Sequence, residues 1–307
     1  MSDAPPAPEL DLTDPHAVAQ TLRDAAEAFR GDPLRQGNTV HLPDSGHLIV
    51  TGDLHDHQLN FQRILKLAAL DPASPPPPHS RGSGNGPRHL ILHEVIHGPD
   101  RLNGADLSIR MLTRCAALKL RFPQQVHILL SNHELAQMQG EGITKHGVSV
   151  VDAFDLGVEY LYGDAAAEVQ HAVEDYVRSL PLAVRCANRL MISHSLPSPR
   201  RIESFDKTIL DRPLTDEDYL NKASAYDMVW GRYQNATVTA ELAEAWDVDA
   251  FIIGHQPAEM GYETLAENTL IIASDHAHGV ALSLDLARHY RRDDLIHGIR
   301  ALAGVTV

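Results

Sequence analysis

The sequence predicts a mixed α/β domain in which parallel strands alternate with helices. Short apolar runs at residues 48–50, 90–92 and 128–130 predict buried strands, and segments with helical periodicity separate them. This rhythm of strand, crossover helix and strand favours parallel pairing. Because the carboxyl ends of parallel strands meet at one edge of a sheet, polar residues that follow these runs are candidates for a common site.

Length and composition fit one large domain with an aliphatic core. The chain has 307 residues, of which 43% are hydrophobic and 5% aromatic, so it can bury a substantial core built from Leu, Val, Ile and Ala. Its formal net charge of -15 disfavours a polyanion-binding surface. We therefore expect no nucleic-acid partner.

Cysteine usage and hydropathy indicate a cytoplasmic protein. The two cysteines, Cys115 and Cys186, exclude a disulfide framework and fit a reducing compartment. No stretch approaches the roughly 18 apolar residues of a membrane span, and the first residues lack the pattern of a signal peptide. We expect no membrane partner.

Capping residues and apolar spacing predict the order of the elements. Asp14 followed by Pro15 predicts the start of the first helix, and residues 40–42 and 48–50 predict a strand pair around a Pro-Asp-Ser-Gly turn. Further helices are expected near residues 61–68, 104–120, 150–162, 165–179, 239–245 and 292–304, with strands at 89–96, 126–130, 183–186, 190–193, 250–253, 269–273 and 280–284.

Three segments stand apart from this rhythm. Residues 1–13 are Pro-rich and acidic and predict a mobile tail, and residues 71–88, with four successive prolines, predict a low-complexity surface loop. Residues from about 135 to 180 are mainly helical in pattern and predict a helical insertion. We expect a single domain over residues 14–307 that contains the loop and the insertion.

The polar residues that follow the apolar runs have the chemistry of a metal site. Asp53 and His55 lie two apart in extended chain, so their side chains can leave on the same side. Carboxylates, an amide oxygen and imidazoles suit divalent manganese, iron or zinc, and a central carboxylate can bridge two ions about 3.5–4 Å apart. In chain order the set is Asp53, His55, Glu94, Asn132, His133, His194 and His255.

These residues lie in blocks that resemble those of the calcineurin-like metallophosphoesterase superfamily. The nearest resemblance is to its Ser/Thr phosphoprotein phosphatase branch and the bacterial relatives of that branch. Residues 52–56 (Gly-Asp-Leu-His-Asp) resemble the G-D-x-H-G block, residues 131–134 (Ser-Asn-His-Glu) resemble G-N-H-E, and residues 254–255 (Gly-His) resemble the late G-H block. Residues 180–183 (Leu-Pro-Leu-Ala) resemble the family strand that precedes its metal histidine, and the similarity spans about residues 47–285.

The resemblance implies a four-layer α/β/β/α sandwich with a dinuclear metal centre. It implies two divalent ions, with manganese first and iron or zinc as alternatives, held by Asp53, His55, the bridging Glu94, Asn132, His194 and His255. His133 would be the general acid, since an imidazole can change charge near neutral pH. Trp230-Gly231-Arg232 resembles a W-x-R element, so Arg232 is a candidate clamp for phosphoryl oxygens.

The second family block, G-D-x-x-D-R-G, is altered in this chain. Glu94 replaces the bridging aspartate and is one methylene longer. His97 stands where a carboxylate would orient the general acid, and Gly98 stands where a phosphate-binding arginine would be. We hypothesise that Asp100 and Arg101, three residues further on, restore both roles if the turn is longer.

Additional histidines cluster around the same blocks. We expect them to line the pocket, with tuning of proton transfer or binding of an extra ion as alternatives; they are His57, His93, His97, His276 and His278.

The resemblance implies a phosphoester hydrolase that uses a metal-activated hydroxide for direct attack, without a covalent phosphoenzyme. A phosphorylated protein is the substrate typical of the family. A dinucleoside polyphosphate or another small phosphoester is an alternative, since bacterial relatives share these blocks. A third reading, prompted by the altered second block, is a metal-binding scaffold with little catalysis.

Overall fold

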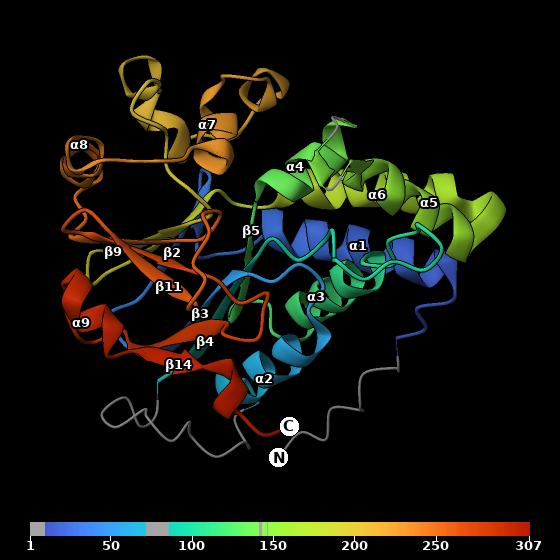
Figure 1. Ribbon diagram of the computed structural model, residues 1–307, viewed down its shortest axis with the longest axis horizontal. Coiled ribbons are helices and arrows are strands. Elements are labelled where there is room, and N and C mark those ends of the chain that lie inside the picture. The colour runs from blue at the N-terminus through green and yellow to red at the C-terminus, as the bar shows by residue number, and fades with distance from the viewer. Residues whose placement is uncertain (1–9, 72–85, 141–142, 146) are drawn as a thin grey trace.

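Two β-sheets lie face to face with helices outside them in the computed structural model, which describes residues 10–71, 86–140, 143–145 and 147–307 (Figure 1). The five-stranded sheet has the order β14-β13-β3-β4-β5. Its strands are β3 (His47–Asp53), β4 (Arg88–His93), β5 (Val126–Leu129), β13 (Val280–Asp285) and β14 (Ile299–Ala301). The mixed α/β sandwich predicted from the sequence is confirmed.

The second sheet has seven strands in the order β1-β2-β8-β9-β10-β12-β11. They are β1 (Arg35–Gln36), β2 (Thr39–Leu42), β8 (Ala183–Cys186), β9 (Leu190–Ser193), β10 (Ala250–Ile253), β11 (Tyr262–Leu265) and β12 (Thr269–Ile272). A short antiparallel pair, β6 (Thr144–Lys145) and β7 (Val148–Ser149), lies apart from both sheets.

Parallel pairing occurs where the alternation of strands and helices predicted it. β3, β4 and β5 pair in parallel in one sheet, and β9, β10 and β12 do so in the other. The carboxyl ends of these strands therefore lie at one edge of each sheet, which is where the candidate ligands follow them.

The layer between the sheets is aliphatic, as the low aromatic content indicated. Val50 and Ile91 of one sheet and Ile192, Ile252 and Leu270 of the other are fully buried members of one cluster. Burying each such side chain stabilises the fold by about 1.5–3 kcal/mol. This layer packs the two sheets against each other and fixes their relative position.

Helices cover the outer faces (Figure 1). They are α1 (Pro15–Arg30), α2 (Gln58–Ala68), α3 (Ile109–Arg121), α4 (Asn132–Gln139), α5 (Val150–Tyr162), α6 (Ala166–Ser179), α7 (Ser224–Trp230), α8 (Ala236–Trp246) and α9 (Arg292–Ile296). α1 starts as predicted, with Pro15 in its first turn and the Asp14 carboxylate accepting from His16 N at 2.9 Å. None of the helices in the described ranges is long and apolar enough to cross a membrane.

Three predicted elements differ from the structure. The expected strand pair at 40–42 and 48–50 is wrong, because β2 pairs with β1 and β8 whereas β3 pairs with β4 and β13 in the other sheet. The helix predicted at 104–120 begins only at Ile109, since the Asp106 carboxylate accepts from Ser108 N and holds a turn there. The predicted terminal helix at 292–304 stops at Ile296, and β14 then pairs with the edge of β13.

The predicted tail and the predicted Pro-rich loop fall mostly on residues that the structure does not describe. Residues 1–9 of the tail and 72–85 of the loop lie outside the described ranges.

The two sheets meet directly at the end of β3. Ser274 N donates to Asp53 O at 3.0 Å, and Gly52 N donates to Ser274 Oγ at 2.9 Å. A Cβ at Gly52 would lie 2.0 Å from Ile272 O of β12, so only glycine allows this approach. The backbone of one sheet thereby positions Asp53 against the other.

A buried ionisable cluster lies at the amino ends of β4 and β5, opposite the carboxyl ends that carry the candidate ligands. Lys119 Nζ lies 2.6 Å from Asp32 Oδ2, and both side chains are almost fully buried. The rings of His89 and His127 stack beside them at 5.6 Å. Burial is the main cause that lowers the pKa of His89 from 6.5 to about 4 and the pKa of His127 well below its ordinary value.

We predict that acid destabilises the fold through His89. The ring stays neutral in the folded chain down to about pH 4 but takes up a proton at about pH 6.5 once unfolded. The stability contributed by the neutral ring is therefore complete above pH 6.5 and declines as the pH falls towards 4. At pH 5 the loss should be about 1–2 kcal/mol.

Urea denaturation at pH 7 and pH 5 measures this effect. His89→Gln should show a smaller difference between the two pH values than the unsubstituted chain, and the exposed His171 supplies the matched His→Gln control. Equal pH dependence in the His89 variant and the unsubstituted chain would contradict the assignment.

Candidate metal centre

Five strand ends bring the candidate residues together. Asp53 closes β3 and Glu94 directly follows β4, whereas Asn132 and His133 open α4 just after β5. His194 directly follows β9 and His255 lies two residues beyond β10. Residues that are up to 202 positions apart in the sequence are therefore in direct contact, as between Asp53 and His255.

Glu94 lies at the middle of this cluster. Its Oε1 atom lies 3.7 Å from His55 Nε2 and 3.3 Å from His133 Nε2, and its Oε2 atom lies 3.6 Å from His194 Nε2. The Glu94 carboxylate thus lies between imidazoles on both sides. This is where the sequence predicts a carboxylate that could bridge two ions.

Asp53 forms the other side of the cluster. Its Oδ1 atom lies 3.6 Å from His194 Nδ1, and both carboxylate oxygens accept from His255 N at 3.0 Å. Gly254 makes this contact possible, because a Cβ there would lie 2.3 Å from Asp53 Oδ1 and 2.8 Å from His93 Cε1. Arg232 Nε lies 2.9 Å from His255 Nε2, so the guanidinium reaches the cluster as well.

His194 lies between His93 and two other candidate ligands. Thr51 O can only accept, so His93 carries its proton on Nε2, which lies 2.6 Å from that oxygen. His93 Nδ1 lies 3.1 Å from His194 Nδ1 and would accept its proton in the tautomer of His194 that offers the Nε2 lone pair to a cation. His194 Nε2 lies 2.7 Å from Asn132 Oδ1 and 3.6 Å from Glu94 Oε2.

The converging lone pairs have the chemistry of a cation site. Burial is the main cause that lowers the pKa of His194 well below its usual range, and burial together with the neighbouring Arg232 guanidinium lowers the pKa of His255 to about 3. Both imidazoles are therefore neutral at physiological pH, the state that binds metals. Ligand atoms within 4.8 Å of one another form three groups, which are Asp53–His93–His194, His55–Glu94–His133 and Glu94–His194–His255. The donor set fits divalent ions.

Next to this cluster, His97 contacts His133. Their Nδ1 atoms lie 2.8 Å apart, and the His97 ring also packs edge-on against Phe154. Asp100, the carboxylate predicted to orient His133, lines a neighbouring cavity of about 610 Å³ together with Arg110 and Arg114. The partner that faces the proposed general acid is an imidazole.

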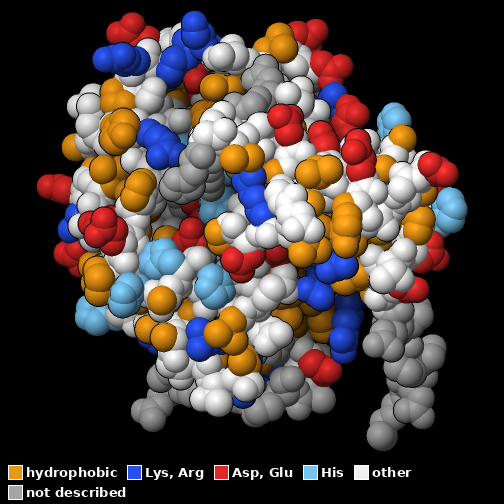
Figure 2. All heavy atoms as spheres, turned by 45° about the vertical axis from the view of Figure 1, so that its right-hand side comes forward, with side chains coloured by type: hydrophobic (Ala, Val, Ile, Leu, Met, Phe, Trp, Pro, Cys, Tyr) orange, Lys and Arg blue, Asp and Glu red, His pale blue; other side chains and the backbone are white. Residues whose placement is uncertain are grey.

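Arg101 lies on the wall of the cavity that opens beside the cluster. This cavity measures about 300 Å³ and is lined by His55, His97, Gly98, Pro99, Arg101, Val148 and Asp275. Figure 2 shows several histidine side chains gathered on one face of the molecule, with acidic side chains among them. Arg232 contacts His255 of the same cluster, so the two arginines approach it from different segments of the chain.

The other histidines have mixed surroundings. His57 Nδ1 accepts from Asn60 N at 3.2 Å at the start of α2, and its side chain lines the larger cavity. His276 Nε2 lies 3.1 Å from Ala258 O. His93 is fully buried and contacts His194, so it does more than line a pocket.

Two features of the site escaped the sequence analysis. Glu134 is fully buried and accepts from Val95 N at 2.8 Å and Ile96 N at 3.3 Å, which holds the turn between Glu94 and His97. Glu134 lies three residues after Ser131, which caps α4, and this spacing is that of a capping box. The spacing could have marked Glu134 as a structural residue from the sequence.

The second missed feature is the backbone of the site. Left-handed φ values occur at His55 (44°), Glu94 (51°), His97 (61°) and His255 (64°). Each costs on the order of 1 kcal/mol or more for a residue with a Cβ. No local sequence pattern marks these positions.

Comparisons with known proteins agree with this arrangement. The sequence is 24% identical over 259 residues to a probable serine/threonine-protein phosphatase of Encephalitozoon cuniculi, covering 80% of this chain and 50% of that protein. It is 22% identical over 249 residues to a serine/threonine-protein phosphatase of Caenorhabditis elegans, covering 76% of this chain and 48% of that protein. The chain thus spans about half the length of these curated relatives. No protein-family model matches it.

Solved phosphatase structures share the fold. A protein serine/threonine phosphatase from Saccharomyces cerevisiae superimposes with a TM-score of 0.61 at 15% identity, covering 93% of this chain and 88% of that one. A cold-active protein-tyrosine phosphatase of a Shewanella species gives a TM-score of 0.55 at 14% identity, with coverages of 90% and 84%.

The chain therefore shares the fold of these solved phosphatases. The similarity to curated phosphatases agrees with the resemblance of its ordered sequence blocks to the calcineurin-like metallophosphoesterase superfamily.

We predict that Gly254→Ala weakens metal binding. The added methyl group would displace Asp53 or His93, each of which contacts it within 3 Å. We expect a fall of about tenfold or more in affinity for Mn²⁺, since disturbing the residues that hydrogen-bond to metal ligands typically lowers metal affinity by that much. Isothermal titration calorimetry measures it. Gly304→Ala is the control, since a Cβ there meets nothing within 4 Å; equal affinity in both variants would count against the site.

Proposed function

We propose that the chain is a metal-dependent phosphomonoesterase of the Ser/Thr protein phosphatase type. The observation that carries the proposal is the convergence of imidazoles from three other strand ends on the central carboxylate of Glu94. The similarity to curated Ser/Thr phosphatases supports the same reaction class.

Two ions would share Glu94. Asp53 and His55 would complete the set for the first ion, and the second would be held by Asn132, His194 and His255. When bound, such ions polarise a phosphoryl oxygen and lower the pKa of a water molecule towards neutrality. Manganese is our first choice, with iron or zinc as alternatives, because the donor set mixes carboxylates with imidazoles.

His133 would donate the proton that the leaving oxygen needs. Its Nε2 atom lies on the Glu94 side of the ring, and its Nδ1 atom is occupied by the contact with His97. General acids of this kind contribute about 10²–10⁴ to the rate. Only one ring nitrogen then has to exchange the proton.

Arg101 and Arg232 would hold the remaining phosphoryl oxygens. A guanidinium offers a planar fork of donors that matches two oxygens at once. Arg101 lies on the wall of the 300 Å³ cavity, and Arg232 contacts His255. Two arginines from separate segments would bind the phosphoryl group from two directions.

The preferred substrate would be a phosphorylated serine or threonine side chain on a protein. The names of the curated relatives favour it. Because one structural neighbour is a protein-tyrosine phosphatase, a substrate panel should contain phosphoserine, phosphothreonine and phosphotyrosine peptides.

We predict that His133→Asn lowers kcat for phenyl phosphate, whose leaving group needs a proton, by about a hundredfold or more while metal content is unchanged, because asparagine cannot donate the proton. Metal analysis combined with a phosphate-release assay in added Mn²⁺ measures both quantities. Two bound ions with no turnover in the unsubstituted chain would instead favour a metal-binding scaffold.

We predict that Arg101→Ala lowers kcat/KM by roughly tenfold to a hundredfold, since it removes charge-assisted hydrogen bonds to the phosphoryl group. Arg121, an exposed residue of α3, supplies the matched Arg→Ala control. Unaltered turnover and affinity in the Arg101 variant would remove this residue from the mechanism.

A further inference from the structure

We propose that His97, Gln137 and Asp155 form a hydrogen-bonded chain that positions His133, in place of a single carboxylate. Its catalytic consequence rests on the proposed function, but the hydrogen-bond order does not. The three residues act as positioning residues, because none of them has to touch the substrate.

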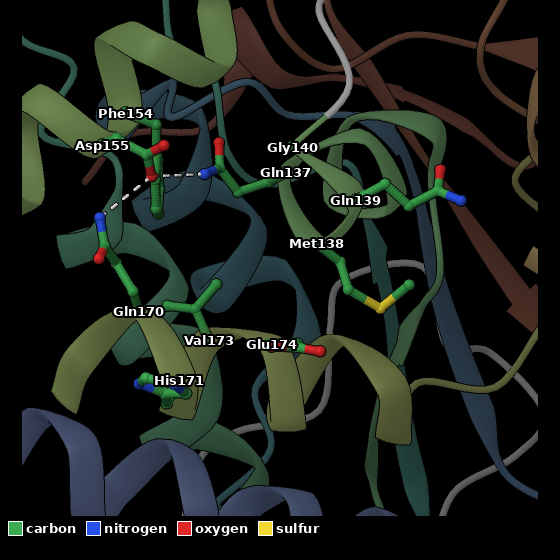
Figure 3. Close-up of a pocket in the computed structure, with 10 residues that line it drawn as sticks. All are labelled: Gln137, Met138, Gln139, Gly140, Phe154, Asp155, Gln170, His171, Val173 and Glu174. Atoms are coloured by element: carbon green, nitrogen blue, oxygen red, sulfur yellow. Dashed lines mark hydrogen bonds between the residues drawn. The ribbon is translucent and has the colours of Figure 1, made fainter. Parts of the chain in front are cut away.

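The chain of contacts runs from the metal cluster into the helical segment. His97 Nδ1 lies 2.8 Å from His133 Nδ1, and His97 Nε2 lies 2.9 Å from Gln137 Oε1. Gln137 Nε2 donates to Asp155 Oδ1 at 2.9 Å, and Gln170 Nε2 donates to the same oxygen at 3.4 Å. Figure 3 shows both amide groups pointing at the Asp155 carboxylate.

The carboxylate at the outer end sets the direction of every bond. An ionised carboxylate only accepts, so the NH₂ group of Gln137 faces Asp155 and its oxygen faces His97. The proton of His97 must then lie on Nε2, which leaves a lone pair on Nδ1. His133 donates its Nδ1 proton to that lone pair, and its Nε2 atom becomes the one that exchanges a proton.

Packing makes this arrangement rigid. His97 is 2% exposed and His133 is 4% exposed, and the His97 ring centroid lies 5.7 Å from that of Phe154. Ser108 Oγ accepts from His97 N at 3.0 Å, which fixes the backbone behind the ring. Neither ring can turn without losing contacts.

The outer residues come from three helices. Gln137 lies on α4, Asp155 on α5 and Gln170 on α6, so the predicted helical insertion would be tied to the orientation of the general acid. Gln137 and Asp155 also line a cavity of about 400 Å³, so substituted side chains have room there (Figure 3). Burial raises the pKa of Asp155, and the hydrogen bonds from both amides oppose that rise.

The first experiment reads the tautomers directly. Long-range ¹H–¹⁵N correlation spectra of ¹⁵N-histidine-labelled protein, with and without Zn²⁺, should show the Nε2–H form for His97 and the Nδ1–H form for His133. Gln137→Leu should remove the preference of His97 for that form. An Nδ1–H form of His97 in the unsubstituted chain would overturn the proposal.

The second experiment varies the leaving group. Phenol leaves poorly and depends on proton donation, whereas p-nitrophenol depends on it much less. We expect Gln137→Leu to lower kcat for phenyl phosphate by roughly tenfold and to change kcat for p-nitrophenyl phosphate far less. Gln139→Leu is the matched control, since Gln139 lies on the same helix and donates to Tyr219 O instead. Equal losses on both esters would overturn the proposal.

A double-mutant cycle completes the test. In His97→Asp, the new carboxylate would accept from His133 without help, so adding Gln137→Leu should cost no further turnover of phenyl phosphate. A full additional loss in that background would show that Gln137 acts by another route. Thermal denaturation of each variant confirms that it is folded.

The outcomes distinguish this inference from the proposed function. Correct tautomers in a chain that hydrolyses neither ester would reject the function and retain the hydrogen-bond chain. Turnover with equal losses on both esters would retain the function and reject the positioning role.

Discussion

The close approach of β3 to β12 at Gly52 and Asp53 is the constraint on which the site depends. It joins the two sheets through backbone and Ser274 hydrogen bonds at the point where the first ligand stands. Gly254 allows the corresponding approach on the other side, so that His255 N donates to Asp53. Gly52 and Gly254, which are not candidate ligands themselves, therefore determine how closely the candidate ligands of the two sheets approach each other. The aliphatic layer behind them keeps that separation fixed.

The altered second block supplies hydrogen-bonding partners as well as a candidate ligand. His93 and His97 lie on either side of Glu94 in the sequence, and each contacts the Nδ1 atom of another candidate residue, His194 or His133. In both pairs the second nitrogen of the supporting ring contacts an oxygen atom, Thr51 O for His93 and Gln137 Oε1 for His97. Where the family block has a carboxylate and an arginine, this chain places imidazoles beside the candidate residues, and one of them contacts Gln137 of α4.

The sequence was informative where chemistry follows a strand. Asp53, Glu94, Asn132, His194 and His255 were found because each ends or follows an apolar run, and parallel pairing brings such ends together. Sheet membership was not predictable, since adjacent apolar runs at 40–42 and 48–50 look like a hairpin although they belong to different sheets. The His93 and His97 contacts were not predictable either. They depend on ring orientation and on partners such as Thr51 and Gln137, which no spacing rule links to them.

The left-handed backbone at His55, Glu94, His97 and His255 restricts how such a centre can change. Among residues with a Cβ, this conformation is tolerated best by Asn, Asp and His. Those same side chains are metal ligands or their hydrogen-bonding partners. The backbone conformation and the coordination chemistry therefore favour the same three residue types, so substitutions among Asn, Asp and His should be tolerated best at these positions. Glu94 is not one of these types. Substituting aspartate for Glu94 would therefore reduce the backbone strain and shorten the side chain that could bridge two ions.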